Sequence, residues 1–260
     1  MYANKAPRWE PLVPTANLVA GLLAASGAIA AIQAIQVAAA MSGVIDVTVP
    51  IGQLGQQLQA EISPAPLGGI VSLLTLGTGV TWLFWQHRAQ RDLYARALPG
   101  LKYTPGWAVG WWFIPLANLV MPYLCVRELW DGAGRVPGSP AAARRDWKLL
   151  TWWLTYIASS YLVVIGFAPV IGAIFRSISD QAASNGSTRI TSITLSAASI
   201  HTAQLWTIAG DTIRAFAAGL AVWLVLTISR REDAGGGAVA EPVTGLPWPP
   251  PMIPPRPDMW

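Results

Sequence analysis

Long apolar stretches alternate along the chain with short polar or charged segments. An α-helix needs about 20 apolar residues to cross a hydrocarbon layer of roughly 30 Å. The chain offers four stretches of that order, at residues 14–41, 67–85, 149–175 and 205–229. This pattern predicts an all-α fold, a polytopic membrane helix bundle built by residues 1–231. We interpret residues 14–41 as a span and not as a signal peptide, whose apolar core is only about 7 to 15 residues long.

A fifth apolar stretch, residues 107–126, contains Pro115 and Pro122. Each proline removes a backbone donor and clashes with the preceding turn, so an intact helix is not expected here. If this stretch crossed the membrane, the Lys and Arg residues outside the spans would divide equally, eight to each side. If it enters and returns, fourteen lie on one side and two on the other. Because Lys and Arg accumulate in cytoplasmic loops, we predict four transmembrane helices plus a Pro/Trp-rich re-entrant or interfacial hairpin, with cytoplasmic N- and C-termini. Five transmembrane helices are the alternative.

Composition agrees with a membrane protein. Of 260 residues, 53% are hydrophobic and 12% are charged, whereas a soluble domain has about 25% charged residues. Membrane orientation explains the net charge of +4, and no basic cluster interleaved with aromatic residues lies on a polar segment, so we expect no nucleic-acid partner. The single cysteine, Cys125, excludes an internal disulfide, and His87 and His201 lie on opposite predicted sides, so we expect no metal site. Richness in Ala, Gly, Pro and Arg is typical of bacteria with GC-rich genomes, and we expect a multi-pass protein of a bacterial inner membrane.

The end of the chain differs in composition from the rest. Residues 232–260 contain a glycine triplet and eight prolines. Such a segment cannot pack a core, so we predict a disordered or polyproline II tail in the cytoplasm. The run Pro251-Met252-Ile253-Pro254 has the spacing that proline-binding domains recognise. A cytosolic partner of this tail is one interpretation, and an unstructured end without a partner is the other.

A dense motif surrounds the predicted hairpin. It reads Phe84-Trp85-Gln86-His87-Arg88-Ala89-Gln90-Arg91, then Tyr103-Thr104-Pro105-Gly106-Trp107-Ala108-Val109-Gly110-Trp111-Trp112-Phe113-Ile114-Pro115-Leu116-Ala117-Asn118-Leu119, then Pro122-Tyr123 and Arg127-Glu128-Leu129-Trp130. This block closely resembles the bacterial membrane family catalogued as domain of unknown function 4328. The resemblance implies flanking helices over most of residues 15–231. It implies no activity, because none is assigned to the family.

Twelve residues of this block are candidates for binding lipid or a partner: Arg88, Arg91, Trp107, Gly110, Trp111, Trp112, Pro115, Asn118, Pro122, Arg127, Glu128 and Trp130. Tryptophan rings suit the headgroup level of a bilayer. Arg88 and Arg91 suit anionic lipid headgroups, or they serve membrane orientation alone. Arg127 and Glu128 are placed to pair with the first basic loop. The amide of Asn118 needs partners in an apolar setting, either a ligand at a broken helix or the hairpin itself.

The last span contains Asp211 and Arg214, three residues apart and therefore on one helical face. Such an intramembrane pair indicates an ion or proton path, or else a local structural pair near the outer end. Catalytic patterns such as H-E-x-x-H, G-x-S-x-G and the Walker motif are missing from the sequence. We therefore assign no catalytic residue and no cofactor, and we interpret Cys125 as a small buried hydrophobe.

Together these features favour a non-enzymatic integral membrane protein that binds lipid, a membrane-protein partner or a second copy of itself. The alternative is a small transporter or channel that uses the broken hairpin around Asn118 and the Asp211/Arg214 pair.

Overall fold

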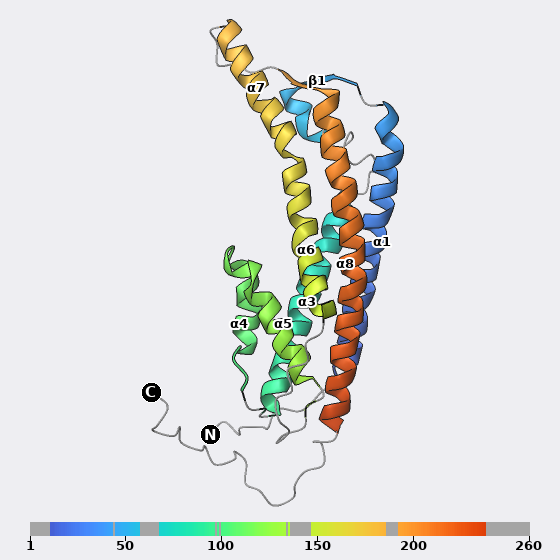
Figure 1. The fold of residues 1–260 in the computed structure, drawn as a ribbon, viewed down its shortest axis with the longest axis vertical. Coiled ribbons are helices and arrows are strands. Elements are labelled where there is room, and N and C mark those ends of the chain that lie inside the picture. Colours follow the sequence, from blue (N-terminus) through green and yellow to red (C-terminus); the bar gives the residue numbers. More distant parts are fainter. Residues whose placement is uncertain are drawn as a thin grey trace, which may run out of the picture.

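The structure, a computed structural model, describes residues 11–43, 45–57, 68–96, 98, 100–133, 135, 147–185 and 192–237. These residues form an elongated, mostly helical bundle (Figure 1). Its long helices are α1 (Val13–Ala40), α3 (Gly68–Ala95), α6 (Trp147–Gly166), α7 (Ala168–Asn185) and α8 (Ala197–Gly237). We call the end that holds the start of α1 and the ends of α3 and α8 the lower end, and the opposite end the upper end.

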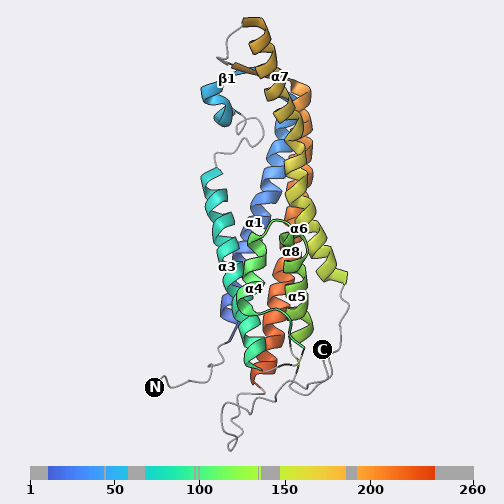
Figure 2. The same ribbon diagram turned by 90° about the vertical axis from the view of Figure 1, so that its left-hand side faces the viewer.

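Helix α8 is central to the bundle and packs against both α1 and α6 (Figures 1 and 2). Small residues allow α1 to come close to it. A Cβ added at Gly27 of α1 would lie 2.9 Å from the Cβ of Ala218, and Ala30 and Ala34 of α1 are buried. Small residues at a helix contact are how membrane helices approach each other closely, because lipid supplies no hydrophobic force between them.

Three helical segments are long and apolar enough to cross a membrane: Val13–Ala40, Trp147–Ala183 and Ala197–Gly235. The outer surface of these segments is apolar. Ile35, Leu154 and Phe216 are 69%, 57% and 55% exposed, respectively. Exposed apolar side chains of this size are unfavourable in water and favourable in lipid. The predicted all-α fold is confirmed, and three of its helical segments could cross a membrane. Helix α3, whose last turns are charged, is not among the three segments, so the count of four spans stays a prediction.

The predicted span at residues 149–175 is two helices and not one. Helix α6 ends at Gly166, and α7 begins at Ala168 after a turn at Phe167. Pro169, in the first turn of α7, lacks the N–H that a continuous helix would use. Helix α7 then continues past the predicted limit to Asn185.

The upper end is closed by a two-stranded antiparallel sheet. Strand β1 (Val47–Pro50) pairs with β2 (Ser192–Leu195), with Val47 opposite Leu195 and Pro50 opposite Ser192. Around the sheet lies a small core of Val170, Ala173, Ile193, Leu195, Ile200 and Ala203. The loops after α1 and after α7 therefore lie at one end of the molecule, whereas five consecutive crossings would place them at opposite ends.

The segment predicted to be a hairpin folds back on itself. It consists of α4 (Pro105–Gly110), the 3-10 turns η3 (Trp111–Phe113) and η4 (Ala117–Leu119), and α5 (Met121–Gly132). Figures 1 and 2 show α4 rising from the lower end and α5 returning to it, beside α3 and α6. Pro115 lies in the turn between the limbs, as predicted for a helix break. Pro105 and Pro122 stand in the first turns of α4 and α5, where a missing N–H costs nothing.

At the lower end, the predicted start of the tail at residue 232 is wrong. Helix α8 does not stop at Arg231 but continues to Gly237, so residues 232–237 are helical. Asp233 explains the extension: its carboxylate accepts hydrogen bonds from the backbone N–H groups of Leu12 (2.8 Å) and Val13 (3.1 Å). These N–H groups begin α1 and have no acceptor within that helix. The rest of the predicted tail, including its PxxP run, lies outside the described residues.

Candidate functional site

Glu128 of α5 docks the hairpin on the lower half of the bundle. Its carboxylate accepts hydrogen bonds from Nε2 of Gln90 (2.6 Å) and from the backbone N–H groups of Lys102 (2.6 Å) and Tyr103 (3.2 Å). Gln90 of α3 also donates to the Tyr103 carbonyl (2.8 Å). Hydrogen bonds to a carboxylate are about twice as strong as neutral ones. The expected contact between Glu128 and the first basic loop therefore exists, and backbone amides make it instead of an ion pair.

Gln86 of α3 holds the tip of the hairpin. Its Oε1 accepts hydrogen bonds from the indole N–H groups of Trp112 (2.8 Å) and Trp82 (3.2 Å), and its Nε2 donates to the Ala108 carbonyl (3.3 Å). The Gln86 side chain is fully buried, so these bonds replace the ones that water would provide. The predictions from sequence missed both Gln86 and Gln90. The sequence did contain a signal for them. The two glutamines are four residues apart and therefore on one helical face, near the end of a helix whose other residues are mainly aromatic or basic.

A cavity of about 460 Å³ lies directly above the hairpin tip. Helices α3 and α6 form its sides, α1 and α8 form its back, and η3 forms its floor. Its volume is within the range of small-molecule sites, about 300–1,000 Å³. Its lining includes Thr78, Gly79, Trp112, Ser159, Ser160 and Arg214.

Aromatic rings close the cavity toward the lower end. Trp82 of α3 stacks on Trp152 of α6 with centroids 5.4 Å apart, and meets Trp112 of the hairpin edge-on at 6.2 Å. Tyr156 of α6 contacts Trp112 at 6.0 Å and Trp152 at 6.4 Å. Aromatic contacts of these geometries add about 0.5–1.5 kcal/mol each beyond area burial. The hairpin is thus joined to both side walls of the cavity by ring contacts.

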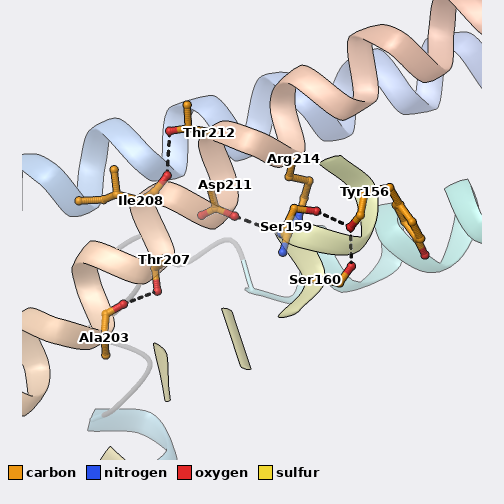
Figure 3. A network of polar contacts seen from close by, with 9 residues as sticks. All are labelled: Tyr156, Ser159, Ser160, Ala203, Thr207, Ile208, Asp211, Thr212 and Arg214. Atoms are coloured by element: carbon orange, nitrogen blue, oxygen red, sulfur yellow. Dashed lines mark hydrogen bonds and ion pairs between the residues drawn. The ribbon is translucent and has the colours of Figure 1, made fainter. Parts of the chain in front are cut away.

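The back wall holds an ion pair between two residues of α8. Nη1 of Arg214 lies 3.1 Å from Oδ1 of Asp211, and the Asp211 side chain is only 6% exposed, against 43% for Arg214. Figure 3 shows Arg214 extending from α8 toward Ser159 on α6. Arg214 lines the cavity and Asp211 does not. The cavity therefore meets the cationic member of the pair.

Asn118 does not occupy the position expected of a ligand-binding residue. Its backbone N–H donates to the Ile114 carbonyl at 2.7 Å, and the residue does not line the cavity. Its Oδ1 is buried without a hydrogen-bond partner among the described residues. Pro115 is exposed in the turn, whereas Pro122 is buried at the start of α5. The hairpin residues that reach the cavity are instead Trp112 and Phe113.

The remaining tryptophans of the motif divide between surface and core. Trp107 is 55% exposed and packs on Trp111 at a centroid distance of 4.8 Å. A Cβ added at Gly110 would lie 3.4 Å from the Trp107 ring, at van der Waals contact. Trp130 is buried against Trp223 of α8. Of these three tryptophans, Trp107 and Trp111 have the partly exposed placement that a lipid-headgroup role requires, and Trp130 does not.

The arginines of the motif also differ in placement. Arg88 donates to the Thr15 hydroxyl (3.1 Å) and the Pro11 carbonyl (3.2 Å), which ties α3 to the start of α1. Arg91 is half exposed. Arg127 is 46% exposed and pairs with Asp131 one turn away at 3.8 Å, a pair of small energetic value.

A buried charge cluster at the lower end was not predicted from the sequence. The side chains of Arg96 and Glu232 are 4% and 1% exposed, with Nη2 and Oε1 3.8 Å apart. Asp92, one turn before Arg96, is also buried. Burial raises the pKa of the Asp92 carboxyl to about 6, although the nearby Arg91, Arg88 and Arg96 lower it. The cluster joins the ends of α3 and α8. No group of three or more His, Cys, Asp or Glu that could hold a metal ion occurs within the described residues.

Comparison with known families gives one match. The model of the family described as a domain of unknown function, DUF4328, matches residues 62–230. The chain belongs to the DUF4328 family. The resemblance based on the hairpin motif is thereby confirmed, and the matched range contains the hairpin, the cavity floor and both members of the Asp211/Arg214 pair. Helix α1 and strand β1 of this DUF4328 protein precede the matched range. No match was found among curated proteins, and none was found among solved structures.

Proposed function

We propose that this DUF4328 protein is a non-enzymatic integral membrane protein that binds an apolar or amphipathic molecule of the bilayer. The observation that supports this proposal is the cavity above the hairpin tip. Its walls are mostly apolar and aromatic, with hydroxyl groups and one arginine as the polar elements. Sites of this kind, apolar with a few convergent polar groups, are typical of small-molecule binding.

The distribution of charge supports a cytoplasmic lower end. Nine of the eleven described Lys and Arg residues belong to segments at the lower end, Arg214 lies within the bundle, and Arg176 belongs to the upper part of α7. An excess of Lys and Arg marks the cytoplasmic side of a membrane protein. We therefore orient the protein in a bacterial inner membrane with the hairpin entering and leaving from the cytoplasm. Arg91 is half exposed at that surface. Its attraction to an anionic lipid headgroup would contribute about 1 kcal/mol to binding.

Helix α3 serves as the fourth span in this proposal. Its 28 residues extend about 42 Å at 1.5 Å per residue, and its first 18 residues carry no charge. With four spans, the two loops joined by β1 and β2 share the outer side. Neither limb of the hairpin then crosses the membrane.

A pair of glycine variants tests the binding function. Gly79 lines the cavity and a Cβ there meets nothing within 4 Å, whereas Gly77, two residues earlier on α3, is equally open but does not line the cavity. We expect native mass spectrometry of the wild-type protein, purified in mild detergent, to show a lipid-derived mass, and we expect Gly79→Phe to fill the cavity and remove it. Gly77→Phe is the matched control and should retain that mass. Equal retention by both variants, with unchanged thermal unfolding, would contradict the proposal.

A small transporter or channel is the second candidate, and Arg214 is the observation that favours it, because intramembrane charges often mark an ion or substrate path. Such a protein needs a route from the cavity past the ring contacts of Trp82, Trp112 and Trp152 to the lower end. Flux into proteoliposomes that Gly79→Phe blocks and Gly77→Phe does not would favour transport over binding alone.

A further inference from the structure

The cavity is lined by one cationic side chain, Arg214, and otherwise mainly by apolar side chains. A ligand that fits both kinds of lining has an anionic head and an apolar chain. We infer, building on the proposed function, that the cavity binds a single-chain amphiphile with a small anionic head, a long-chain carboxylate, with the head at Arg214 and the chain along the aromatic floor. Three features of the site support this ligand class: the unused donors of Arg214, the depth of Arg214, and the shape of the cavity beneath it.

Arg214 has donors to spare. An arginine offers five N–H donors in a planar fork and binds carboxylates in pairs of parallel bonds. In the described residues its ion pair with Asp211 engages Nη1, and no other hydrogen bond or ion pair is formed by this side chain. Asp211 is buried behind it and outside the cavity lining, so it orients the guanidinium without covering its cavity side. The hydroxyl-bearing residues Ser159 and Ser160 line the facing wall on α6.

The depth of Arg214 argues for a small head. It lies nine residues inside the predicted span at residues 205–229, about 14 Å below its upper edge at 1.5 Å per residue. The headgroup of an ordinary phospholipid stays at the membrane surface and cannot satisfy a guanidinium at that depth. Unpaired arginine donors within a membrane are costly. A carboxylate that enters with its own chain would satisfy them.

The chamber offers room for a chain and a way in. Between Arg214 and the floor at Trp112, the cavity is bounded by Leu23, Ala217 and Trp82. Phe113 lines the same cavity and is 71% exposed, so the cavity opens beside the hairpin tip onto the lipid-facing surface. Entry from the bilayer, between α3 and α6, requires no passage through water. Because lipid is as apolar as the cavity, the chain gains little from the transfer itself, so its packing against the cavity walls supplies affinity and the pairing of its head with Arg214 supplies selectivity.

Matched probes test this inference. Delipidated full-length protein in nanodiscs of zwitterionic phosphatidylcholine would be titrated with labelled hexadecanoate and labelled hexadecanol, at a pH where the acid is ionised. We expect the wild type to bind the acid about tenfold more tightly than the alcohol, the size of one charge-assisted hydrogen-bond pair. Arg214→Gln should lose this preference while keeping its affinity for the alcohol, and Arg214→Lys should keep most of it. Asp211→Asn should tighten binding of the acid, because a competing carboxylate is removed.

The outcomes separate the two proposals. Equal affinity of the wild type for acid and alcohol, or a preference for the acid that survives Arg214→Gln, overturns the assignment of the head to Arg214. If Gly79→Phe still blocks both probes in that case, the binding function of the cavity stands. Binding of either probe that Gly79→Phe leaves unchanged, or no binding of either probe, overturns the cavity function and this inference together.

Discussion

The lower and upper halves of the bundle are packed in different ways. In the lower half, the hairpin occupies the space between α3 and α6, and Gln86, Gln90 and Glu128 bind its backbone and rings. In the upper half, the same two helices enclose a cavity. There α3 is joined to α1 by the hydrogen bond between the hydroxyls of Ser26 and Thr78 (3.1 Å).

The length of the hairpin determines how far up the bundle the space between α3 and α6 is filled. Helix α4 has 6 residues and α5 has 12, whereas α3 beside them has 28. Two short helices therefore fill only part of the gap between two long ones, and the tip becomes the floor of the remaining space. A site at mid-depth results without any irregularity in the long helices. Three predictions test this division, from the largest expected effect to the smallest.

Removal of the Glu128 carboxylate should have the largest effect. Glu128→Ala deletes three hydrogen bonds and leaves the N–H groups of Lys102 and Tyr103 without their acceptor. We expect a loss of about 3 kcal/mol in the free energy of unfolding, measured by thermal or denaturant unfolding in detergent. Faster hydrogen exchange in residues 102–119 should accompany it. Arg127→Ala is the matched control on the next residue, and its exposed ion pair predicts about 0.5 kcal/mol or less. Similar losses for the two variants would show that Glu128 does not dock the hairpin.

The buried Asp92 should make stability depend on pH. Burial raises its pKa to about 6 from an ordinary value of 3.8, against the opposing effect of Arg91, Arg88 and Arg96 and with a smaller raising effect of Asp233. Between these pH values the folded protein holds more protons than the unfolded chain, so the contribution of Asp92 is greatest at low pH and is lost as the pH rises through about 6.

The variant Asp92→Asn isolates this contribution. We expect the difference in unfolding free energy between variant and wild type to grow in favour of the variant by about 2 kcal/mol from pH 4 to pH 7. Unfolding in detergent across that range measures it. A difference that does not change with pH, or changes in the opposite direction, would contradict the assigned shift in the pKa of Asp92.

The smallest effect is expected from the polar bond of the upper half. Thr78→Val removes the hydroxyl that meets Ser26 and keeps the shape of the side chain. Hydrogen bonds between membrane helices average about 0.6 kcal/mol, so the unfolding temperature should fall only slightly. A loss as large as that of Glu128→Ala would mean that the upper half is not the loosely joined part of the bundle.

Local pattern was sufficient to predict the helices and the turn of the hairpin. Apolar stretches of spanning length correspond to α1, to α6 and α7 together, and to α8. Pro115 lies in the predicted break, and Pro122 begins the returning helix. These features depend on residues close together in the chain, because a proline disrupts its own turn and apolar residues favour lipid wherever they lie. The end of α8 was misplaced since Asp233 and Glu232 are held by α1 and α3, which local composition does not reveal.

The sequence by itself determined that this is an all-α protein of the DUF4328 family with helices apolar enough to cross a membrane and a helix broken by prolines between them, because apolar length, proline position and the aromatic motif are properties of short segments. Only the tertiary structure decided which polar residues matter. Gln86 meets Trp112 twenty-six residues away, Gln90 meets Glu128 thirty-eight residues away, and Arg214 gains its place in the cavity from helices far from it in the chain. A buried polar group must find partners, but the order of residues in the chain does not reveal which ones. Here the distance that the hairpin extends along α3 and α6 determines which polar groups meet.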